Sequence, residues 1–105
     1  MLFLKPRKDV NEGYNEFKNT PDAVLIDVRT PNEFEFARIP ESFNLPLSRL
    51  KSAEKVIPDK TTPVFICCTS GGRAEKAVKR LRRMGYENVR SIGGLNRYRG
   101  DVEQG

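Results

Sequence analysis

The sequence predicts an α/β fold in which a central parallel sheet carries helices on both of its faces. Two short apolar runs, "AVLID" at residues 23–27 and "TPVFICC" at residues 62–68, have the composition of strands that are buried on both sides. Segments with helical spacing of apolar residues lie between the strand candidates. Strands that alternate with helices pair in parallel through right-handed crossovers. A chain of 105 residues is expected to form a single domain over residues 1–105.

The elements of the first half are predicted from apolar spacing and capping residues. Leu2–Leu4 is a candidate edge strand, and Asp9 can cap a helix that continues through Phe17. After the strand at 23–27, the motif "TPNE" begins with a threonine and ends with a glutamate three residues later, which is the spacing of a capping box. We interpret this pair, Thr30 and Glu33, as a helix cap alone.

The second half of the chain continues the alternation. "FNLPL" at residues 43–47 is a brief extended piece, and Ser48 can cap a helical segment that Pro58 terminates. Residues 74–85 form an amphipathic helix that ends at a glycine, which suits the first position after a helix. "NVRSI" at residues 88–92 is a third strand, followed by a turn into a last short helix.

Composition excludes several kinds of chemistry. The chain contains no histidine, so Cys–His pairs and imidazole metal sites are ruled out, and we expect no metal and no cofactor. The net charge of +5 suits nucleic acid, an acidic partner or an anionic small substrate, and the sign alone does not choose among them. The basic residues lack the interleaved aromatics of a nucleic-acid site, so no nucleic-acid partner is expected. No apolar run reaches the ~20 residues of a membrane span, and the first ten residues lack a signal-peptide core, so a cytoplasmic location without membrane binding is expected.

The loop "CTSGGR", from Cys68 to Arg73, follows a strand and precedes a helix. Its two glycines, Gly71 and Gly72, allow successive backbone N–H groups to point inward, and the helix N-terminus adds its positive dipole end. This arrangement binds an anion and favours a thiolate, so Cys68 is the candidate nucleophile. An arginine at a helix N-terminus opposes the dipole, which makes sense where an anion or the Cys68 thiolate lies beside it. Cys67 continues the strand, and because side chains alternate along a strand, we expect the two cysteines to differ in exposure.

Three segments in register resemble the single-domain rhodaneses, a family of sulfurtransferases. They are "LIDVRTPNEFEFARIPESFNLPL", "VFICCTSGGRA" and "SIGGLNRY", and the resemblance spans residues 24–98. It implies the compact rhodanese fold and a Cys68 persulfide that carries sulfane sulfur. It also implies a small anionic donor, thiosulfate or a persulfide, and a thiol or a partner protein as the acceptor. The residues that the resemblance assigns to substrate binding are Thr69, Ser70, Gly71, Gly72 and Arg73, and Asp27 and Arg29 are the supporting pair.

The chain departs from the family pattern at three places: residues 38–42 where many members have "HIPGA", Thr69, and Tyr98 where a tryptophan is common. Glu41 stands where a glycine is common, which would cost stability if the position requires a positive φ. Thr69 stands where many members have arginine or lysine, so a charge that could attract thiosulfate is missing.

Two other function classes remain open from the sequence. Loops with a cysteine and an arginine also serve phosphatases and arsenate reductases, and a rhodanese-like module without activity could dock a partner through its basic surface. Only four residues separate Cys68 from Arg73, whereas the phosphatases that resemble this fold have five. The shorter loop leaves less room for three phosphoryl oxygens, and it therefore favours sulfur transfer.

Overall fold

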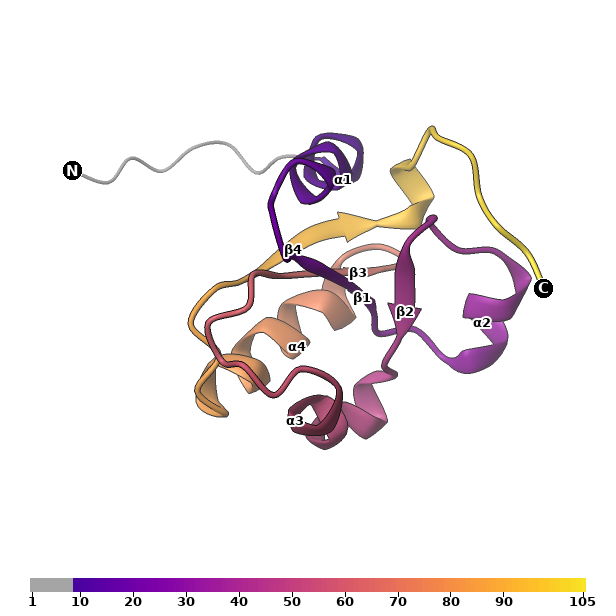
Figure 1. The fold of residues 1–105 in the computed structure, drawn as a ribbon. Helices are drawn as coiled ribbons and strands as arrows, with labels where there is room; N and C mark the ends of the chain where they lie inside the picture. Colours follow the sequence, from indigo (N-terminus) through magenta and orange to yellow (C-terminus); the bar gives the residue numbers. More distant parts are fainter. Residues whose placement is uncertain (1–8) are drawn as a thin grey trace.

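A computed structural model describes residues 9–105, and four strands in it form one sheet (Figure 1). All neighbouring strands pair in parallel, in the order β2-β1-β3-β4, which confirms the predicted fold class. The candidate strand at Leu2–Leu4 lies outside the described residues. The strands are β1 (Val24–Asp27), β2 (Ser42–Asn44), β3 (Val64–Cys68) and β4 (Val89–Gly94).

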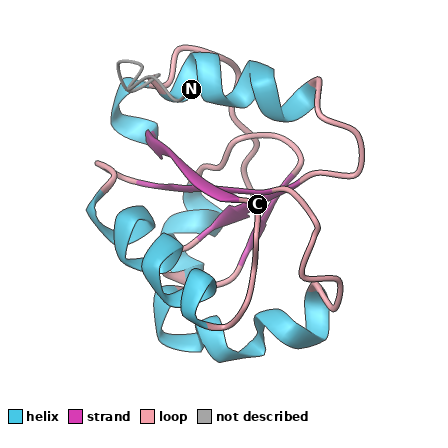
Figure 2. Ribbon diagram, turned by 90° about the vertical axis from the view of Figure 1, so that its left-hand side faces the viewer, coloured by secondary structure: helices cyan, strands magenta, loops and turns pink. Residues whose placement is uncertain are grey.

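Helices cover the sheet on both faces, as Figures 1 and 2 show. Helix α1 (Val10–Lys18) packs on one face, where its core cluster includes apolar residues of β1, β3 and β4. The other face carries α4 (Gly72–Arg83), the 3₁₀ helix η1 (Leu47–Ser52) and α3 (Ala53–Val56), which share a second core cluster. The strands are therefore buried from both sides, as their apolar composition predicted.

Two of the predicted helix caps are confirmed and one is wrong. Asp9 and Thr30 each form a full capping box, at the start of α1 and of α2 (Pro31–Phe36). Ser48 caps nothing, because η1 begins one residue earlier, at Leu47, and has no side-chain cap. The Leu47 N–H donates to the carbonyl of Val28, the residue after β1, at 3.0 Å. This backbone bond sets where η1 begins.

Glu41, which stands where the family pattern often has glycine, adopts a strained backbone conformation. Its φ is +71°, in the turn that leads into β2. The left-handed region costs a residue with a Cβ roughly 1–2 kcal/mol relative to the right-handed one. The turn is held by two bonds to the Ile39 carbonyl, from the Ser42 N–H at 3.2 Å and the Ser42 hydroxyl at 2.6 Å. Local hydrogen bonding thus offsets part of the strain that a glycine would avoid.

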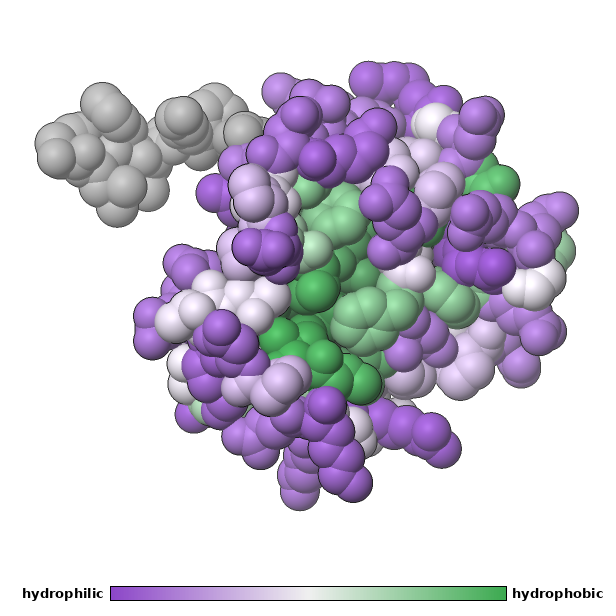
Figure 3. All heavy atoms as spheres, in the orientation of Figure 1, coloured by the Kyte–Doolittle hydropathy of each residue, from purple (hydrophilic) through white to green (hydrophobic). Residues whose placement is uncertain are grey.

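Hydrophilic residues cover most of the face seen in Figure 3, and apolar residues show in the hollow between α1 and the α3–α4 side. None of the helices in residues 9–105 is long and apolar enough to cross a membrane.

The C-terminal tail of the chain contacts α2 and the residues just after it. A 3₁₀ helix, η2 (Leu95–Arg97), follows β4, and the tail after it returns to form an isolated antiparallel bridge between Arg38 and Glu103. The Gly105 N–H also donates to the Glu35 carbonyl at 2.9 Å. The C-terminus therefore lies beside α2, as Figure 1 shows.

Candidate active site

The site lies where β3 ends and α4 begins, at the carboxyl ends of the parallel strands, where open α/β sheets bind their ligands. Cys68 is the last residue of β3, and its Sγ accepts hydrogen bonds from two backbone amides. The Gly71 N–H donates at 2.9 Å and the Ala74 N–H at 3.4 Å. Gly71 has a φ of +106° and is the N-cap of α4, so its backbone turns back toward the sulfur. Two amides at the N-terminus of a 12-residue helix therefore favour a negative charge on Sγ.

The loop is held from the other side by the end of β4 and by η2, which follows it. The Asn96 N–H donates to the Thr69 carbonyl at 3.0 Å. A Cβ added to Gly94 would lie 1.9 Å from the same carbonyl oxygen, so only glycine allows this approach. A register shift in the β3–β4 pairing after Ile66 precedes the contact. The last part of β4 thus fixes the path of the loop after Cys68.

Both cysteines are buried, so the expected difference in their exposure is wrong. Cys67 is 0% exposed and Cys68 is 1% exposed. The reason is that helices cover both faces of the sheet, so alternation moves the two side chains to different cores and neither one to solvent. What differs is the surroundings of each sulfur. Burial raises the pKa of the Cys67 thiol well above its usual value, and the Asp27 carboxylate raises it further, whereas the Cys68 sulfur receives two N–H donors.

Asp27, the last residue of β1, forms a buried ion pair with Arg29, two residues later. Arg29 donates to the Asp27 carboxylate through Nε at 2.9 and 3.0 Å, through Nη2 at 2.7 Å and through its backbone N–H at 2.9 Å. Arg29 Nη2 also donates to the Ala37 carbonyl at 2.6 Å, beyond the end of α2. The side-chain amide of Asn44 donates to the backbone carbonyls of Asp27 and Arg29, each at 2.9 Å. The pair therefore joins β1, β2 and α2 beneath the loop.

Arg73 contacts a carboxylate that the sequence reading assigned to a helix cap alone. Arg73 Nη1 and Nη2 donate to Glu33 Oε1 and Oε2 at 2.8 and 3.0 Å, and Nη2 also donates to Thr69 Oγ1 at 3.0 Å. Glu33 still completes its capping box with Thr30, but it serves the loop as well, so our interpretation of it as a cap alone is wrong. The adjacency of β1 and β3 explains the meeting, because the carboxyl ends of neighbouring parallel strands lie at one edge. That rule, applied to Glu33, could have predicted the contact from sequence.

The Glu33–Arg73 pair predicts a loss of stability in acid. The Arg73 hydrogen bond lowers the pKa of Glu33 from 4.5 to about 2. A depressed folded-state pKa gives stability that is present above pH 4.5 and lost as the pH falls toward 2. The side chains are 35% and 34% exposed, so solvent screening limits the contribution to about 1 kcal/mol or less. Urea unfolding between pH 7 and pH 2 should show this decline in the wild type and a shallower one in Glu33→Gln.

Glu35→Gln is the matched control for this pH series. It removes the same charge from the same helix, and the Glu35 side chain is exposed. Its unfolding curve should follow the wild type through acid. Identical pH profiles for the wild type and Glu33→Gln would contradict the effect of the pair.

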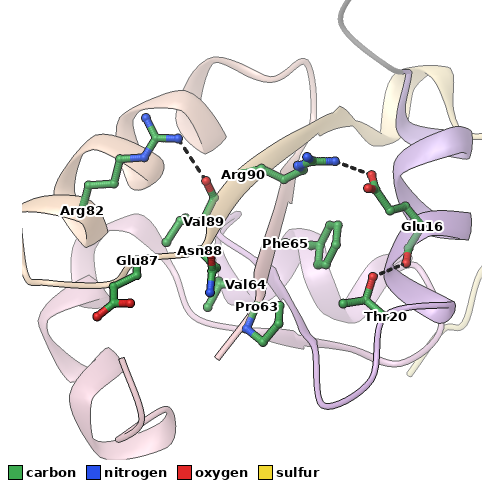
Figure 4. Close-up of a pocket in the computed structure, with 10 residues that line it drawn as sticks. All are labelled: Glu16, Thr20, Pro63, Val64, Phe65, Arg82, Glu87, Asn88, Val89 and Arg90. Carbon is green, nitrogen blue, oxygen red and sulfur yellow. Dashed lines mark hydrogen bonds and ion pairs between the residues drawn. The ribbon is translucent and has the colours of Figure 1, made fainter. Parts of the chain in front are cut away.

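Two of the pockets among the described residues lie at opposite ends of the sheet. A pocket of about 300 Å³ borders the Cys68 loop, where Ser70, Gly94, Asn96 and Arg97 line it. A larger pocket of about 540 Å³ lies at the amino end of β3 (Figure 4), where Arg82 donates to the Val89 carbonyl and Arg90 pairs with Glu16. Within residues 9–105, no three His, Cys, Asp or Glu side chains gather as a metal site would require. The smaller pocket is the one that adjoins the candidate nucleophile.

Comparison with known proteins identifies the family. Residues 9–101 match the rhodanese-like domain. Curated relatives include the adenylyltransferase and sulfurtransferase UBA4 of Meyerozyma guilliermondii, 35% identical over 87% of this chain and 23% of that protein. MOCS3 of Drosophila ananassae, with the same description, is 34% identical over 98% of this chain and 24% of that protein. The chain thus spans about a quarter of the length of the curated relatives it matches.

Solved structures agree with the sequence match. A rhodanese with anions from E. coli superposes with a TM-score of 0.73 at 30% identity, over 79% of this chain and 99% of that one. The human single-domain sulfurtransferase TSTD1 has the same fold, with a TM-score of 0.72 at 24% identity, over 89% of this chain and 94% of that one. The fold is therefore that of known rhodanese structures, and the chain belongs to the rhodanese-like domain family.

Proposed function

We propose that the protein is a sulfurtransferase in which Cys68 carries sulfane sulfur as a persulfide. The observation that supports this most directly is the pair of amide donors, from Gly71 and Ala74, on the Cys68 sulfur. They favour the thiolate, which is the nucleophilic form, without a general base. The match to the rhodanese-like domain and the sulfurtransferase relatives support the same reaction class.

The reaction has two half-steps. In the first, the Cys68 thiolate attacks the outer sulfur of thiosulfate, the S–S bond breaks, and sulfite leaves with its bonding pair, so that Cys68–S–S⁻ remains. With a persulfide donor RS–SH, the thiolate attacks the terminal sulfur and RS⁻ leaves. In the second, an acceptor such as cyanide, a thiol or a partner protein attacks the outer persulfide sulfur and restores the Cys68 thiolate.

The remaining loop residues are proposed to bind the substrate. Thr69 and Ser70 are exposed at the loop, and Ser70 lines the adjoining pocket, so both can contact a donor that approaches Cys68. Gly72 would meet no atom with an added Cβ, so space remains beside its backbone. Arg73 is proposed as a cation near the donor, although Glu33 already contacts its guanidinium. No step in this scheme requires a metal or an organic cofactor.

Mass spectrometry of the intact chain and its peptides tests the proposal. After incubation with thiosulfate or a small persulfide, the peptide that contains Cys67 and Cys68 should gain one sulfur atom, and fragmentation should place that atom on Cys68. Added cyanide should remove it and yield thiocyanate. Hydrolysis of p-nitrophenyl phosphate should stay near background. Cys68-dependent phosphatase turnover without any persulfide would overturn the proposal in favour of the phosphatase class.

A further inference from the structure

The Glu33 carboxylate lies at the rim of the Cys68 loop and forms an ion pair with Arg73, the arginine of that loop. Glu33 Oε1 and Oε2 each accept from the Arg73 guanidinium, and Glu33 Oε2 also lies 3.3 Å from the hydroxyl oxygen of Thr69. Thr69 directly follows Cys68, and Arg73 directly precedes Ala74, whose N–H bonds the sulfur. The Glu33 side chain therefore bridges Thr69, near the start of the loop, and Arg73, at its end.

The contact changes what an approaching donor meets. The guanidinium of Arg73 offers a planar fork to one carboxylate, and Glu33 already fills that fork with two parallel bonds. A donor anion can gain the same contact only by displacing Glu33. The Glu33 carboxylate also repels the negative charge of the donor, whether it stays on Arg73 or is displaced from it, because like charges that lie close together repel. Glu33 thus competes with anionic donors from within the protein.

We propose that Glu33 is a specificity-determining residue that disfavours anionic sulfur donors. On the sulfur transfer proposed above, the preferred donor is a persulfide whose organic group is neutral or cationic, and thiosulfate and carboxylate-bearing persulfides are poor donors. Thr69, at a position where an additional cation would attract thiosulfate, acts in the same direction because its hydroxyl accepts from Arg73 at 3.0 Å.

Three probes that differ in charge test the proposal. Thiosulfate is a dianion, 3-mercaptopropionate persulfide carries a carboxylate, and cysteamine persulfide is of similar size and carries an ammonium group. The rate at which Cys68 gains sulfur is measured for each by quenched mass spectrometry. In Glu33→Gln, loading from thiosulfate and 3-mercaptopropionate persulfide should rise on the order of tenfold, because the charge-assisted Arg73 contact becomes available. Loading from cysteamine persulfide should stay the same or fall.

The variant is designed to remove charge and keep the helix. Glutamine retains an oxygen that can complete the capping box with Thr30, as glutamate does. Glu35→Gln removes the same charge from the exposed side of α2 and should leave all three loading rates unchanged. The wild-type preference should also weaken with added salt, because salt screens charges at the rim.

The outcomes separate this inference from the sulfur-transfer proposal. If no probe loads sulfur onto Cys68 in the wild type, sulfur transfer itself fails. If all three load and Glu33→Gln changes their rates by the same factor, sulfur transfer stands and the specificity role of Glu33 is overturned. Equal effects of Glu33→Gln and Glu35→Gln would also overturn it, since any carboxylate on α2 would then suffice.

Discussion

Replacement of Cys68 by serine is expected to abolish sulfur transfer from thiosulfate to cyanide, with a loss on the order of a thousandfold or more. A serine hydroxyl stays protonated at neutral pH and forms no persulfide. The fold should persist, because the serine oxygen can accept the N–H groups of Gly71 and Ala74 in place of sulfur. Thiocyanate formation under steady-state conditions measures the loss, and circular dichroism with urea unfolding checks the fold.

Cys67→Ala provides the matched control. Cys67 is as deeply buried as Cys68, but it packs in the core beneath α1, and its raised pKa keeps it a neutral thiol. Its removal should leave most of the transfer rate, at a small cost in stability from one lost sulfur atom in the core. Because the two residues are adjacent and equally buried, they differ only in their surroundings. An inactive Cys67→Ala beside an active Cys68→Ser would show that the nucleophile has been assigned to the wrong sulfur.

Local signals in the sequence predicted most of the architecture. Continuous apolar runs identified β1 and β3, Asp9 as an N-cap located the start of α1, and capping-box spacing located the start of α2. These features depend on residues that are near one another in the chain, and propensity and capping describe such interactions well. The error at Ser48 has the opposite origin, since the start of η1 depends on a backbone bond to Val28 that no local pattern reveals.

The sequence predicted the site as a strand–loop–helix unit. The features that this prediction missed come from residues outside the unit. Glu33 and Arg73 are 40 residues apart in sequence and meet because β1 and β3 are neighbours. The burial of Cys68 likewise depends on a core that includes residues from outside the unit, such as Ile26 of β1 and Leu50 of η1. A single loop shows which group is nucleophilic, whereas the charge that a substrate meets at the rim depends on side chains from other strand ends.

Removal of the Arg29 side chain is expected to destabilise the fold strongly. Arg29→Met leaves the Asp27 carboxylate, which is 0% exposed, without its guanidinium partner. Breaking a buried pair by removing one partner costs about 3–5 kcal/mol, because the remaining charge is uncompensated. The variant also loses the bond to the Ala37 carbonyl that ties β1 to the end of α2. Urea unfolding at neutral pH measures the change.

Arg99→Met supplies the comparison, since it removes the same side chain from an exposed pair. Arg99 is 75% exposed and lies 3.8 Å from Asp9, so its loss should change stability by less than about 1 kcal/mol. If the two substitutions lowered the free energy of unfolding equally, burial of the Asp27–Arg29 pair would not be the cause of the loss.

A double variant, Asp27→Leu with Arg29→Met, separates uncompensated charge from lost geometry. Replacing a buried ion pair with apolar groups of similar volume is often neutral or stabilising, so the double variant should recover much of the stability that Arg29→Met loses. The bonds from the side-chain amide of Asn44 to the backbone carbonyls of residues 27 and 29 remain available to hold β2 against β1. If the double variant is no more stable than Arg29→Met, the main contribution of the pair is the geometry of the Arg29–Ala37 contact. Recovery would instead show that the uncompensated Asp27 charge causes most of the loss in Arg29→Met, and a double variant more stable than the wild type would show that the ion pair is kept at a net cost to stability.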